Sequence, residues 1–355
     1  MQKIKASHYD ILFSNQNSSF INDIIFKNKY SKVFILVDSN TKKHCLKLFL
    51  KKHLSEKEIQ LITIKNGEES KNTKSLHSIW IKISKLGGDR NSLLINLGGG
   101  MISDLGGFVA STYNRGIDFI NIPTTLLSMV DASIGGKVGI NIKKLKNKVG
   151  VFNYPKLILI DTSFLQTLPK RELKSGFGEM LKHGLIFEKK YFKRLSELKN
   201  IDSKLNTELI YNSIKIKNEI VNKDPKEKNF RKILNFGHTL GHAIESHFLG
   251  KNKSKTLLHG EAISIGMILE GYISHKILKM PYEQCLHIKK IINSKFEKIK
   301  INSEDSKSII SLIKFDKKNK QGKVHFALIN RIGDAKIDVV VPKKVIIESI
   351  EFYNS

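Results

Sequence analysis

The feature that most constrains the fold is an apolar run at residues 92–97 that leads directly into Gly98, Gly99 and Gly100. A short uninterrupted apolar run is typical of a strand buried on both faces, as in a parallel sheet. Similar runs occupy residues 32–38, 59–64, 119–123 and 157–161, and helical spacing of apolar residues occupies residues 40–54 and 75–86. This alternation predicts an α/β N-terminal domain of Rossmann-like, nucleotide-binding type.

The pattern changes to long helical periodicities from Pro169 onward, and a proline is common at a helix start. Helices are predicted at residues 170–187, 207–221, 232–248 and 261–275, with a strand-like stretch at residues 324–329. We therefore expect two domains, an α/β domain at residues 1–165 and a mainly α-helical domain at residues 166–355.

Composition limits the class of protein and its compartment. Of the 355 residues 40% are hydrophobic, which suffices for two cores, and no apolar run approaches the length of a membrane span. The first residues lack the apolar segment of a secretory signal. Cys45 and Cys285 lie far apart and outside any CxxC motif, which favours a reducing cytoplasm.

The chain carries a net charge of +28. Such a charge can indicate nucleic acid, an anionic membrane or an anionic substrate as partner. The lysines are scattered among Asn and Ile, and no zinc finger, RNP-type aromatic stretch or basic zipper accompanies them. We interpret the excess as solvated surface set by AT-rich codons, and expect neither a membrane nor a specific nucleic acid as partner.

The glycine loop at residues 98–107 follows a predicted strand and opens a predicted helix. Glycine lets a backbone approach a pyrophosphate closely, and a helix start offers free N–H groups. The spacing is not GxGxxG, so a tight turn without a ligand is the alternative. Asp38, at the end of another strand, favours nucleotide binding because an acid there commonly bonds a ribose hydroxyl.

A second polar loop contains Asp131, Lys137, Lys146 and Asn147 among glycines. Lysine can hold a phosphate as a point charge, and aspartate can accept hydrogen bonds from hydroxyls. The segment therefore fits either a phosphorylated polyol or a solvated turn.

Residues 178–182, 235–242 and 258–261 predict a metal centre. Two histidines and one carboxylate, with a fourth position open, are the ligands of a catalytic zinc, whereas a structural site closes with four ligands, often cysteines. His238 and His242 share a helix face, so spacing alone would make both of them ligands. With His259 and Glu179 also available, one histidine would be left for proton transfer.

Together these motifs resemble the 3-dehydroquinate synthase family of the shikimate pathway, within the sugar-phosphate cyclases. The resemblance runs from Asp38 to residues 316–318 and rests on residues 98–107, 113–116, 123–125, 130–137, 179–184, 235–245 and 258–261. It implies an NAD+-binding first domain, a helical metal- and substrate-binding second domain, one divalent metal (Zn2+ or Co2+) and a cytoplasmic homodimer.

The implied activity is that of a carbon–oxygen lyase that converts 3-deoxy-D-arabino-heptulosonate 7-phosphate to 3-dehydroquinate and phosphate, in chorismate and aromatic amino acid biosynthesis. Its steps are oxidation at C5, phosphate elimination, re-reduction, ring opening and aldol closure, with NAD+ recycled in each turnover. Oxidation at C5 acidifies the C6 proton, and a metal on the C4 and C5 oxygens stabilises developing charge. The protein would then mainly position a charged, flexible substrate.

Carried over residue by residue, the resemblance makes Glu179, His238 and His259 the metal ligands and His242 a catalytic histidine near the leaving phosphate. It implies NAD+ contacts at Asp38, Asn40, Glu68, Lys71, Gly99, Gly100, Met101, Asp104, Thr124, Thr125, Lys146, Phe164 and Thr167. It implies a phosphate pocket of Lys137, Asn147, Asn235 and Lys317, with Lys318 as the alternative to Lys317, and carboxylate binding by Lys217 and Arg231. Asp131 and Lys182 would contact substrate hydroxyls, Glu227 would act as general base, and Arg115 would be donated across the dimer interface.

Two departures from the family pattern are Met101, where Val or Ile is usual, and Lys148, which replaces an apolar residue. The alternatives are another sugar-phosphate cyclase, such as a 2-deoxy-scyllo-inosose synthase, and a metal-dependent polyol dehydrogenase. The carboxylate binders Lys217 and Arg231 argue against the other cyclase, whose substrate lacks a carboxylate. A basic nucleic-acid-binding protein is the alternative from a different class.

Overall fold

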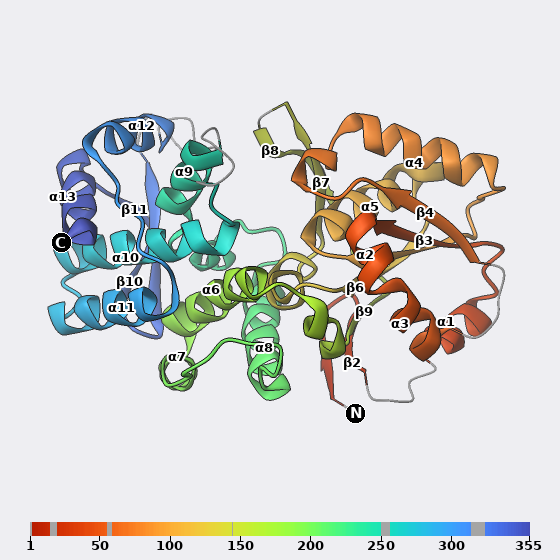
Figure 1. The fold of residues 1–355 in the computed structure, drawn as a ribbon, viewed down its shortest axis with the longest axis horizontal. Coiled ribbons are helices and arrows are strands. Elements are labelled where there is room, and N and C mark those ends of the chain that lie inside the picture. The colour runs from red at the N-terminus through yellow and green to blue at the C-terminus, as the bar shows by residue number, and fades with distance from the viewer. Residues whose placement is uncertain (1, 15–19, 55–58, 144, 250–255, 314–323) are drawn as a thin grey trace. The chain divides into compact units, whose positions relative to one another are not determined.

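The computed structural model describes residues 2–14, 20–54, 59–143, 145–249, 256–313 and 324–355. Contacts within the chain divide it into two compact units, Met1–Leu168 and Pro169–Ser355 (Figure 1). Lys317 and Lys318, both proposed from the sequence for the phosphate pocket, lie outside the described residues.

The first unit is built on a seven-stranded sheet in the order β1-β2-β9-β6-β5-β3-β4. The strands are β1 (Lys3–Lys5), β2 (Asp10–Phe13), β3 (Val33–Asp38), β4 (Ile59–Ile64), β5 (Leu93–Gly98), β6 (Asp118–Pro123) and β9 (Leu157–Ile160). All neighbours pair in parallel except β1, which is antiparallel to β2 at one edge. Numbered from β3, the five strands of the predicted α/β pattern have the order 2-1-3-4-5, the flavodoxin-like doubly wound arrangement. The α/β prediction is thus confirmed.

Helices cover both faces of this sheet (Figure 1). They are α1 (Phe20–Asn28), α2 (Ser39–His44), α3 (Leu46–His53), α4 (Thr73–Lys85) and α5 (Gly100–Thr112). Every residue of β3 and β5 is buried, because side chains alternate between two covered faces. Phe34 and Leu36 pack with α4 and α5 in one core cluster.

A separate two-stranded hairpin, β7 (Lys137–Ile142) and β8 (Leu145–Phe152), packs on α5 through β7. The sequence predicts a polar loop in this region, because glycines and lysines obscure the alternation of buried and exposed residues that is typical of a strand. Val138 and Ile140 of β7 are buried, whereas every residue of β8 is exposed. The hairpin is therefore a fixed element with one uncovered strand.

The second unit is mainly helical, as predicted. Its elements are α6 (Lys170–Phe187), α7 (Lys189–Ser196), α8 (Thr207–Lys223), α9 (His238–Leu249), α10 (His259–Leu278), α11 (Tyr282–Lys295), α12 (Ser303–Ile313), α13 (Lys343–Asn354) and the hairpin β10 (His325–Arg331) and β11 (Asp334–Val340). Helix α10 is central: it contacts α6, α9, α11, α13 and β10. A helix buried on nearly all sides needs apolar residues around its circumference, and α10 has them.

Three predicted elements differ from the structure. The helix expected at residues 40–54 is two helices separated at Cys45, where α2 ends. The helix expected at residues 232–248 is interrupted: a 3-10 helix ends at Asn235, and Gly237 takes a φ of +78°, which a continuous helix cannot contain. Strand β4 lies at the sheet edge and is only partly buried, because apolar runs cannot distinguish an edge strand from a central one.

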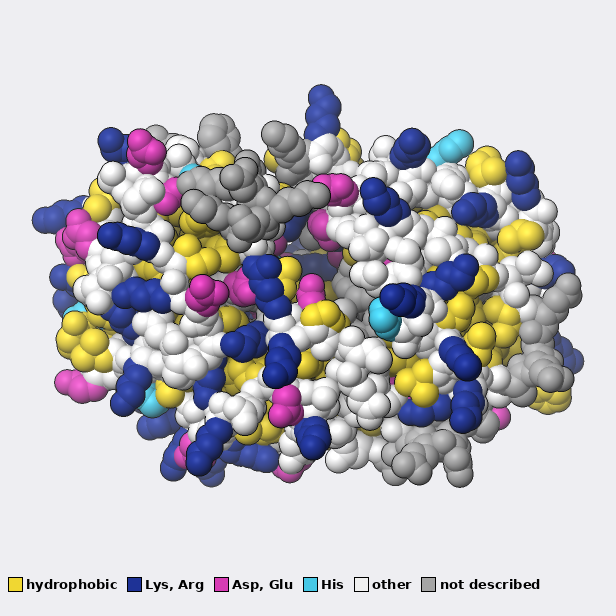
Figure 2. Space-filling view, in the orientation of Figure 1, with side chains coloured by type: hydrophobic (Ala, Val, Ile, Leu, Met, Phe, Trp, Pro, Cys, Tyr) yellow, Lys and Arg dark blue, Asp and Glu magenta, His cyan; other side chains and the backbone are white. Residues whose placement is uncertain are grey.

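Charged side chains are dispersed over the face of the molecule drawn in Figure 2. Figure 2 shows lysines and arginines spread over the visible face, with acidic side chains between them. Among the described residues, no helix is both long and apolar enough to cross a membrane.

Helix α3 is fixed to the end of β9 by a partly buried charged cluster. Asp161 accepts hydrogen bonds from His53 Nε2 at 3.1 Å and Lys52 Nζ at 3.2 Å, and Ser163 Oγ donates to it at 2.6 Å. Burial alone would raise the pKa of Asp161, but the bonds from His53 and Ser163 hold it well below its usual range. The charged carboxylate therefore stabilises the first unit and the 3-10 helix Thr162–Thr167 that follows it.

Asp161→Asn should lower the free energy of unfolding of the first unit by about 2 kcal/mol at pH 7, because hydrogen bonds to a charged group are lost. The folded pKa is depressed, so the contribution is present above the unfolded pKa of about 4 and fades as pH falls below it. Urea unfolding followed by fluorescence of Trp80, the single tryptophan, measures this. The control is Asp10→Asn, which breaks the exposed pair with Lys3. A deficit that stays constant from pH 7 to pH 3 would contradict the assignment.

Candidate metal centre and nucleotide site

Three helices of the second unit bring Glu179, His238 and His259 together. Glu179 lies in the middle of α6, and His238 and His259 are the first residues of α9 and α10. Glu179 Oε1 lies 3.6 Å from His238 Nε2 and 3.7 Å from His259 Nε2. Two ligands held about 2.0–2.1 Å from one tetrahedral ion are roughly 3.3–3.4 Å apart. The separations are therefore close to those of groups that share a metal.

Both histidines are oriented by hydrogen bonds at their other ring nitrogen. His238 Nδ1 is 3.1 Å from the carbonyl oxygen of Phe236, and His259 Nδ1 is 3.3 Å from Glu245 Oε2. Because these partners only accept, each Nδ1 carries the proton, and in a neutral imidazole Nε2 then keeps its lone pair. The donor set of two imidazole Nε2 atoms and one carboxylate oxygen fits a zinc-type divalent ion.

Glu179 divides its two oxygens between the histidines and a lysine. Its Oε2 pairs with Lys182 Nζ one helical turn along α6, while Oε1 faces the histidines. Glu179 and Lys182 are both essentially inaccessible to solvent. Lys182 thus fixes the orientation of the carboxylate and balances its charge.

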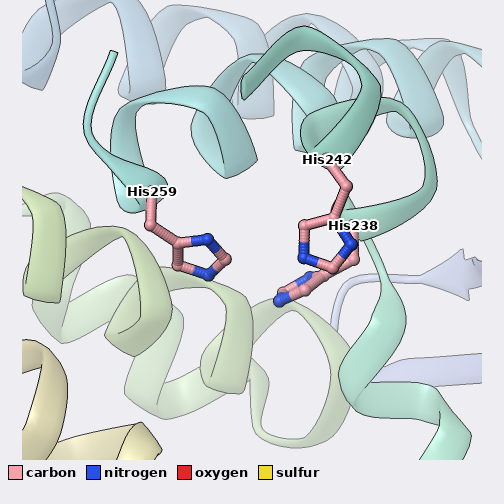
Figure 3. Close-up of side chains that lie close together, drawn as sticks. All are labelled: His238, His242 and His259. Atoms are coloured by element: carbon pink, nitrogen blue, oxygen red, sulfur yellow. The ribbon is translucent and has the colours of Figure 1, made fainter. Parts of the chain in front are cut away.

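His242 lies beside this cluster, one turn along α9 from His238 (Figure 3). A ring nitrogen from each of His238, His242 and His259 lies within 4.8 Å of the other two. Distances alone therefore also admit a three-histidine set. His242 is exposed, while Glu179 is fully buried against His238 and His259. An exposed imidazole next to a metal is well placed to exchange protons with a substrate.

The surrounding charges control protonation of His259. Burial alone lowers the pKa of His259, but the carboxylates of Glu179 and Glu245 outweigh it and raise the pKa to about 10. In the metal-free protein this imidazole is protonated at neutral pH, so metal binding would release a proton.

In the first unit, the carboxyl ends of β3, β5 and β6 meet where the strand order reverses. Leu36 of β3 pairs with Asn96 of β5, so Asp38, two residues further along β3, is level with Gly98 of β5. Gly98 in turn pairs with Pro123 of β6. Ligands of open α/β sheets bind at such a switch point. This places the predicted glycine loop and Asp38 side by side.

The glycine loop starts α5 without a side-chain cap. Gly99 is the N-cap residue and no acid lies in the first turn, so the N–H groups are available to an anion. A Cβ on Gly99 would come 3.1 Å from Thr125 Cγ2, and one on Gly100 would come 3.1 Å from Ala132 Cβ. The backbone is therefore closely surrounded, as a phosphate cradle requires. Met101, the residue that departs from the family pattern, follows in the first turn and is partly buried.

Asp38 caps α2 while keeping one oxygen for a ligand. Its Oδ1 accepts from the backbone N–H groups of Asn40 at 2.8 Å and Thr41 at 2.9 Å. Its Oδ2 makes no hydrogen bond with the described part of the chain. The predicted role in ribose binding is thus compatible with its structural role.

A buried lysine connects several of the predicted cofactor residues. Lys71 is 3% exposed, and its Nζ donates to Asp104 on α5 and to Asn147 on β8. Burial alone would lower the pKa of Lys71, but Asp104 and Glu68 outweigh it and raise the pKa. Asn141 Nδ2 also donates to Glu68 Oε1 at 2.8 Å. The network ties the β7–β8 hairpin to the glycine-loop helix.

The remaining cofactor residues lie around the same sheet edge or on its flanks. Thr124 is buried and its N–H donates to Gly98 O at 3.0 Å, and Thr125 Oγ1 accepts from Ser128 N at 3.1 Å. Phe164 is buried in the 3-10 helix after β9, and Thr167 lies in the same turn. Among the proposed cofactor residues, the exposed ones are Asn40, Glu68, Lys146 and Thr167, and Lys148, one of the departures from the family pattern, is exposed as well.

The predicted substrate residues of the first unit lie on turns and on the β7–β8 hairpin. Asp131 is in the π-helical turn Ser128–Ala132, and Lys137 is exposed at the start of β7. Arg115 has a φ of +70° between two other positive-φ residues, Asn114 and Gly116. Such a backbone is costly for a side chain other than glycine and commonly marks functional loops.

In the second unit, the turn at residues 224–235 collects several predicted substrate residues. Arg231 is 2% exposed, and its Nη1 donates to Pro225 O at 2.7 Å. Asn235 Nδ2 donates to Glu227 Oε1 at 2.9 Å. Lys217 is buried on α8, which packs against the 3-10 helix that carries Arg231.

Sequence reasoning missed the residues that orient the ligands. Glu245 lies two turns after His238 on α9, and that spacing could have revealed it. Ser175, whose Oγ accepts from Gly260 N at 3.0 Å, and Glu270, which accepts from Gly237 N at 2.7 Å, join different helices. No local pattern predicts such contacts.

Known protein families match most of this chain. The family described as 3-dehydroquinate synthase N-terminal matches residues 61–175, and 3-dehydroquinate synthase C-terminal matches residues 176–319. The 3-dehydroquinate synthase of Parabacteroides distasonis is 40% identical over 349 residues, 98% of this chain and 98% of its own length.

Two solved structures have a similar fold. A 2-deoxy-scyllo-inosose synthase complexed with carbaglucose-6-phosphate, NAD+ and Co2+ aligns with a TM-score of 0.82, at 23% identity over 99% of each chain. A 2-epi-5-epi-valiolone synthase from Streptomyces hygroscopicus, with NAD+ and Zn2+ bound, also has a TM-score of 0.82, at 24% identity over 99% of this chain and 98% of its own.

The chain accordingly shares the fold of these two cyclases, a doubly wound unit followed by a helical one. The two family matches and the identity to the Parabacteroides enzyme show that the chain belongs to the 3-dehydroquinate synthase family.

Glu179→Gln should lower metal content and activity together, because an amide is a poorer ligand than a carboxylate. His242→Asn should keep the metal and lose turnover, since His242 is not among the proposed ligands Glu179, His238 and His259. Metal analysis of dialysed protein with an activity assay measures both. Full metal occupancy in Glu179→Gln, or metal loss in His242→Asn, would favour the three-histidine set.

Proposed function

We propose that this chain is a lyase that converts 3-deoxy-D-arabino-heptulosonate 7-phosphate to 3-dehydroquinate and phosphate, in the pathway to chorismate and the aromatic amino acids. The observation that carries the proposal is the Glu179, His238 and His259 cluster, with both Nδ1 atoms anchored, in a member of this family.

One divalent ion, Zn2+ or Co2+, would be held by Glu179, His238 and His259, and NAD+ by the first unit. The two similar structures, which contain NAD+ with Co2+ or Zn2+, support both cofactors. When bound, the ion would polarise neighbouring substrate oxygens, and NAD+ would take a hydride and return it within the turnover. The NAD+ contacts we propose are Asp38, Asn40, Glu68, Lys71, Gly99, Gly100, Met101, Asp104, Thr124, Thr125, Lys146, Phe164 and Thr167.

The residues around the metal centre would handle protons and hydroxyls. Lys182 keeps Glu179 oriented and would donate to a substrate hydroxyl, while Asp131 would accept from one. His242, exposed beside the ligands, would serve proton transfer near the leaving phosphate. Glu227, hydrogen-bonded to Asn235, would act as general base.

Substrate charge would be recognised by basic side chains and amides. Lys217 and Arg231 would bind the carboxylate, and their burial favours a tight, desolvated ion pair. Lys137, Asn147, Asn235 and Lys317 would bind the phosphate, with Lys318 as the alternative to Lys317. Phosphate is a good leaving group once the adjacent C–H is acidified, so holding the substrate would be the main task of the protein.

The first test is phosphate release from 3-deoxy-D-arabino-heptulosonate 7-phosphate by purified protein with NAD+, with and without a chelator. The expected result is chelator-sensitive release without net NADH. A polyol dehydrogenase would accumulate NADH, and another cyclase would release phosphate only from a different sugar phosphate. Absence of release with added Zn2+ or Co2+ would contradict the proposal.

Arg231→Ala should raise KM by roughly 10- to 100-fold, because a charged hydrogen bond is worth about 1.5–3 kcal/mol. The matched control is Arg194→Ala, which breaks an exposed pair with Glu208. Since Arg231 also donates to Pro225 O, Tm is measured alongside. Unchanged KM and kcat would remove Arg231 from the carboxylate pocket.

We further propose a homodimer in which β8 meets a second copy. Leu145, Val149, Val151 and Phe152 are 57%, 39%, 42% and 44% exposed on this strand. An uncovered apolar strand is a site for pairing with another chain. Val151 and Phe152 also line an open hollow of about 520 Å3 with Arg115, the residue proposed to be donated to the partner. A cytoplasmic location is proposed on the two buried free thiols.

Val151→Glu should shift the protein towards monomer, because a charge on an apolar interface must be desolvated. Sedimentation velocity measures the mass. The matched control is Leu286→Glu, which changes an equally exposed leucine on α11. A wild-type monomer, or a Val151→Glu dimer of unchanged affinity, would exclude β8 as the interface.

A further inference from the structure

The turn that precedes α9 is held in a fixed position against α10. Gly237 takes a φ of +78°, and a Cβ there would lie 2.6 Å from Met267 Cγ. A Cβ on Gly266 would lie 2.0 Å from Gly237 O. The backbone before His238 therefore lies directly on α10, the helix that carries His259.

A buried carboxylate of α10 holds the start of α9. Glu270 is completely inaccessible to solvent. Its Oε2 accepts from Gly237 N at 2.7 Å and its Oε1 from Leu240 N at 3.0 Å. These two N–H groups flank His238 and belong to a helix start, where negative charge is stabilised and charge-assisted bonds are strong.

We propose that Glu270 is a positioning residue of the metal centre: by holding the backbone on both sides of His238, it fixes the place of the His238 imidazole relative to Glu179 and His259. Its two hydrogen bonds are to backbone N–H groups, so the proposed effect passes through the backbone on either side of His238. The inference rests on the proposed metal site and adds a determinant of metal affinity to it.

Helices α6 and α10, which carry Glu179 and His259, are also joined by polar contacts. Gly260 N, next to His259, donates to Ser175 Oγ of α6 at 3.0 Å. Arg171 of α6 donates to both oxygens of Glu261 at 2.7 Å, and Glu261 Oε2 accepts from Leu258 N at 2.8 Å. Polar contacts thus fix α10 to α6, and Glu270 supplies the corresponding fixation of α9 to α10.

The test compares Co2+ binding by purified wild-type and Glu270→Gln protein in competition with a chelator. The amide keeps one acceptor but turns an N–H towards the other backbone N–H. The expected result is a Kd for Co2+ weaker by about 10- to 100-fold, the usual effect of losing a group that orients a ligand, with an altered visible spectrum of bound Co2+.

The matched control is Asp305→Asn. Asp305 is another buried carboxylate, and it accepts from His247 Nε2 at 2.7 Å near the far end of α9. This variant should lower Tm while leaving the Co2+ affinity and spectrum unchanged. Equal losses of affinity in both variants would reduce Glu270 to a general stabilising role and overturn the proposal. So would wild-type affinity and spectrum in Glu270→Gln.

If Glu270→Gln does not fold, Glu270→Asp serves instead. It keeps the charge and withdraws the carboxylate by one methylene, so the Kd for Co2+ should still weaken several-fold, and an unchanged Kd would overturn the proposal. Failure of the metal site itself has a different signature, because wild-type protein would then bind no Co2+ more tightly than Glu179→Gln does.

Discussion

The close contact between α6 and α10 is the constraint on which the metal centre depends. A Cβ on Gly260 would lie 1.9 Å from the carbonyl oxygen of Ser175, so only glycine permits this approach. The same contact brings His259, which precedes Gly260, opposite Glu179, one turn along α6 from Ser175. The separation of 3.7 Å between His259 Nε2 and Glu179 Oε1 follows from it. Packing of backbones, rather than flexible side chains, therefore sets the distance between His259 and Glu179.

Hydrogen bonds outside the ligand set then orient the imidazoles. Phe236 O and Glu245 each accept from an Nδ1 atom, which leaves the Nε2 atoms directed at the carboxylate. Lys182 orients the carboxylate of Glu179 by pairing with its Oε2 atom. Buried polar groups are costly unless they are paired, so a network in which each member orients the next resists rearrangement. A preorganised site of this kind needs little movement to accept a cation.

The nucleotide site depends on a different principle, the reversal of strand order in a parallel sheet. Strands β3 and β5 are neighbours whose carboxyl ends are level. Asp38 ends β3 and the glycine loop follows β5, so the two lie close together. The β7–β8 hairpin is joined to this region because Lys71 donates to Asn147 of β8. Sequence patterns found the buried strands and the helix after Gly100, since apolar runs and periodicities report burial directly. They missed the hairpin, because its buried residues alternate with glycines and lysines.

The sequence by itself determined the α/β and helical halves, the glycine loop and the residues able to bind a metal, because these depend on local pattern and side-chain chemistry. The start of α9 at His238 was not predictable in this way: residues 232–248 have continuous helical spacing, and only packing of Gly237 on α10 interrupts it. Likewise, the spacing of His238 and His242 on one helix face makes both of them candidate ligands. The tertiary structure separates their surroundings: His238 is buried with its Nε2 3.6 Å from Glu179 Oε1 of α6, whereas His242 is exposed. These surroundings, and the role proposed for Glu270, depend on distances between helices that no local periodicity encodes.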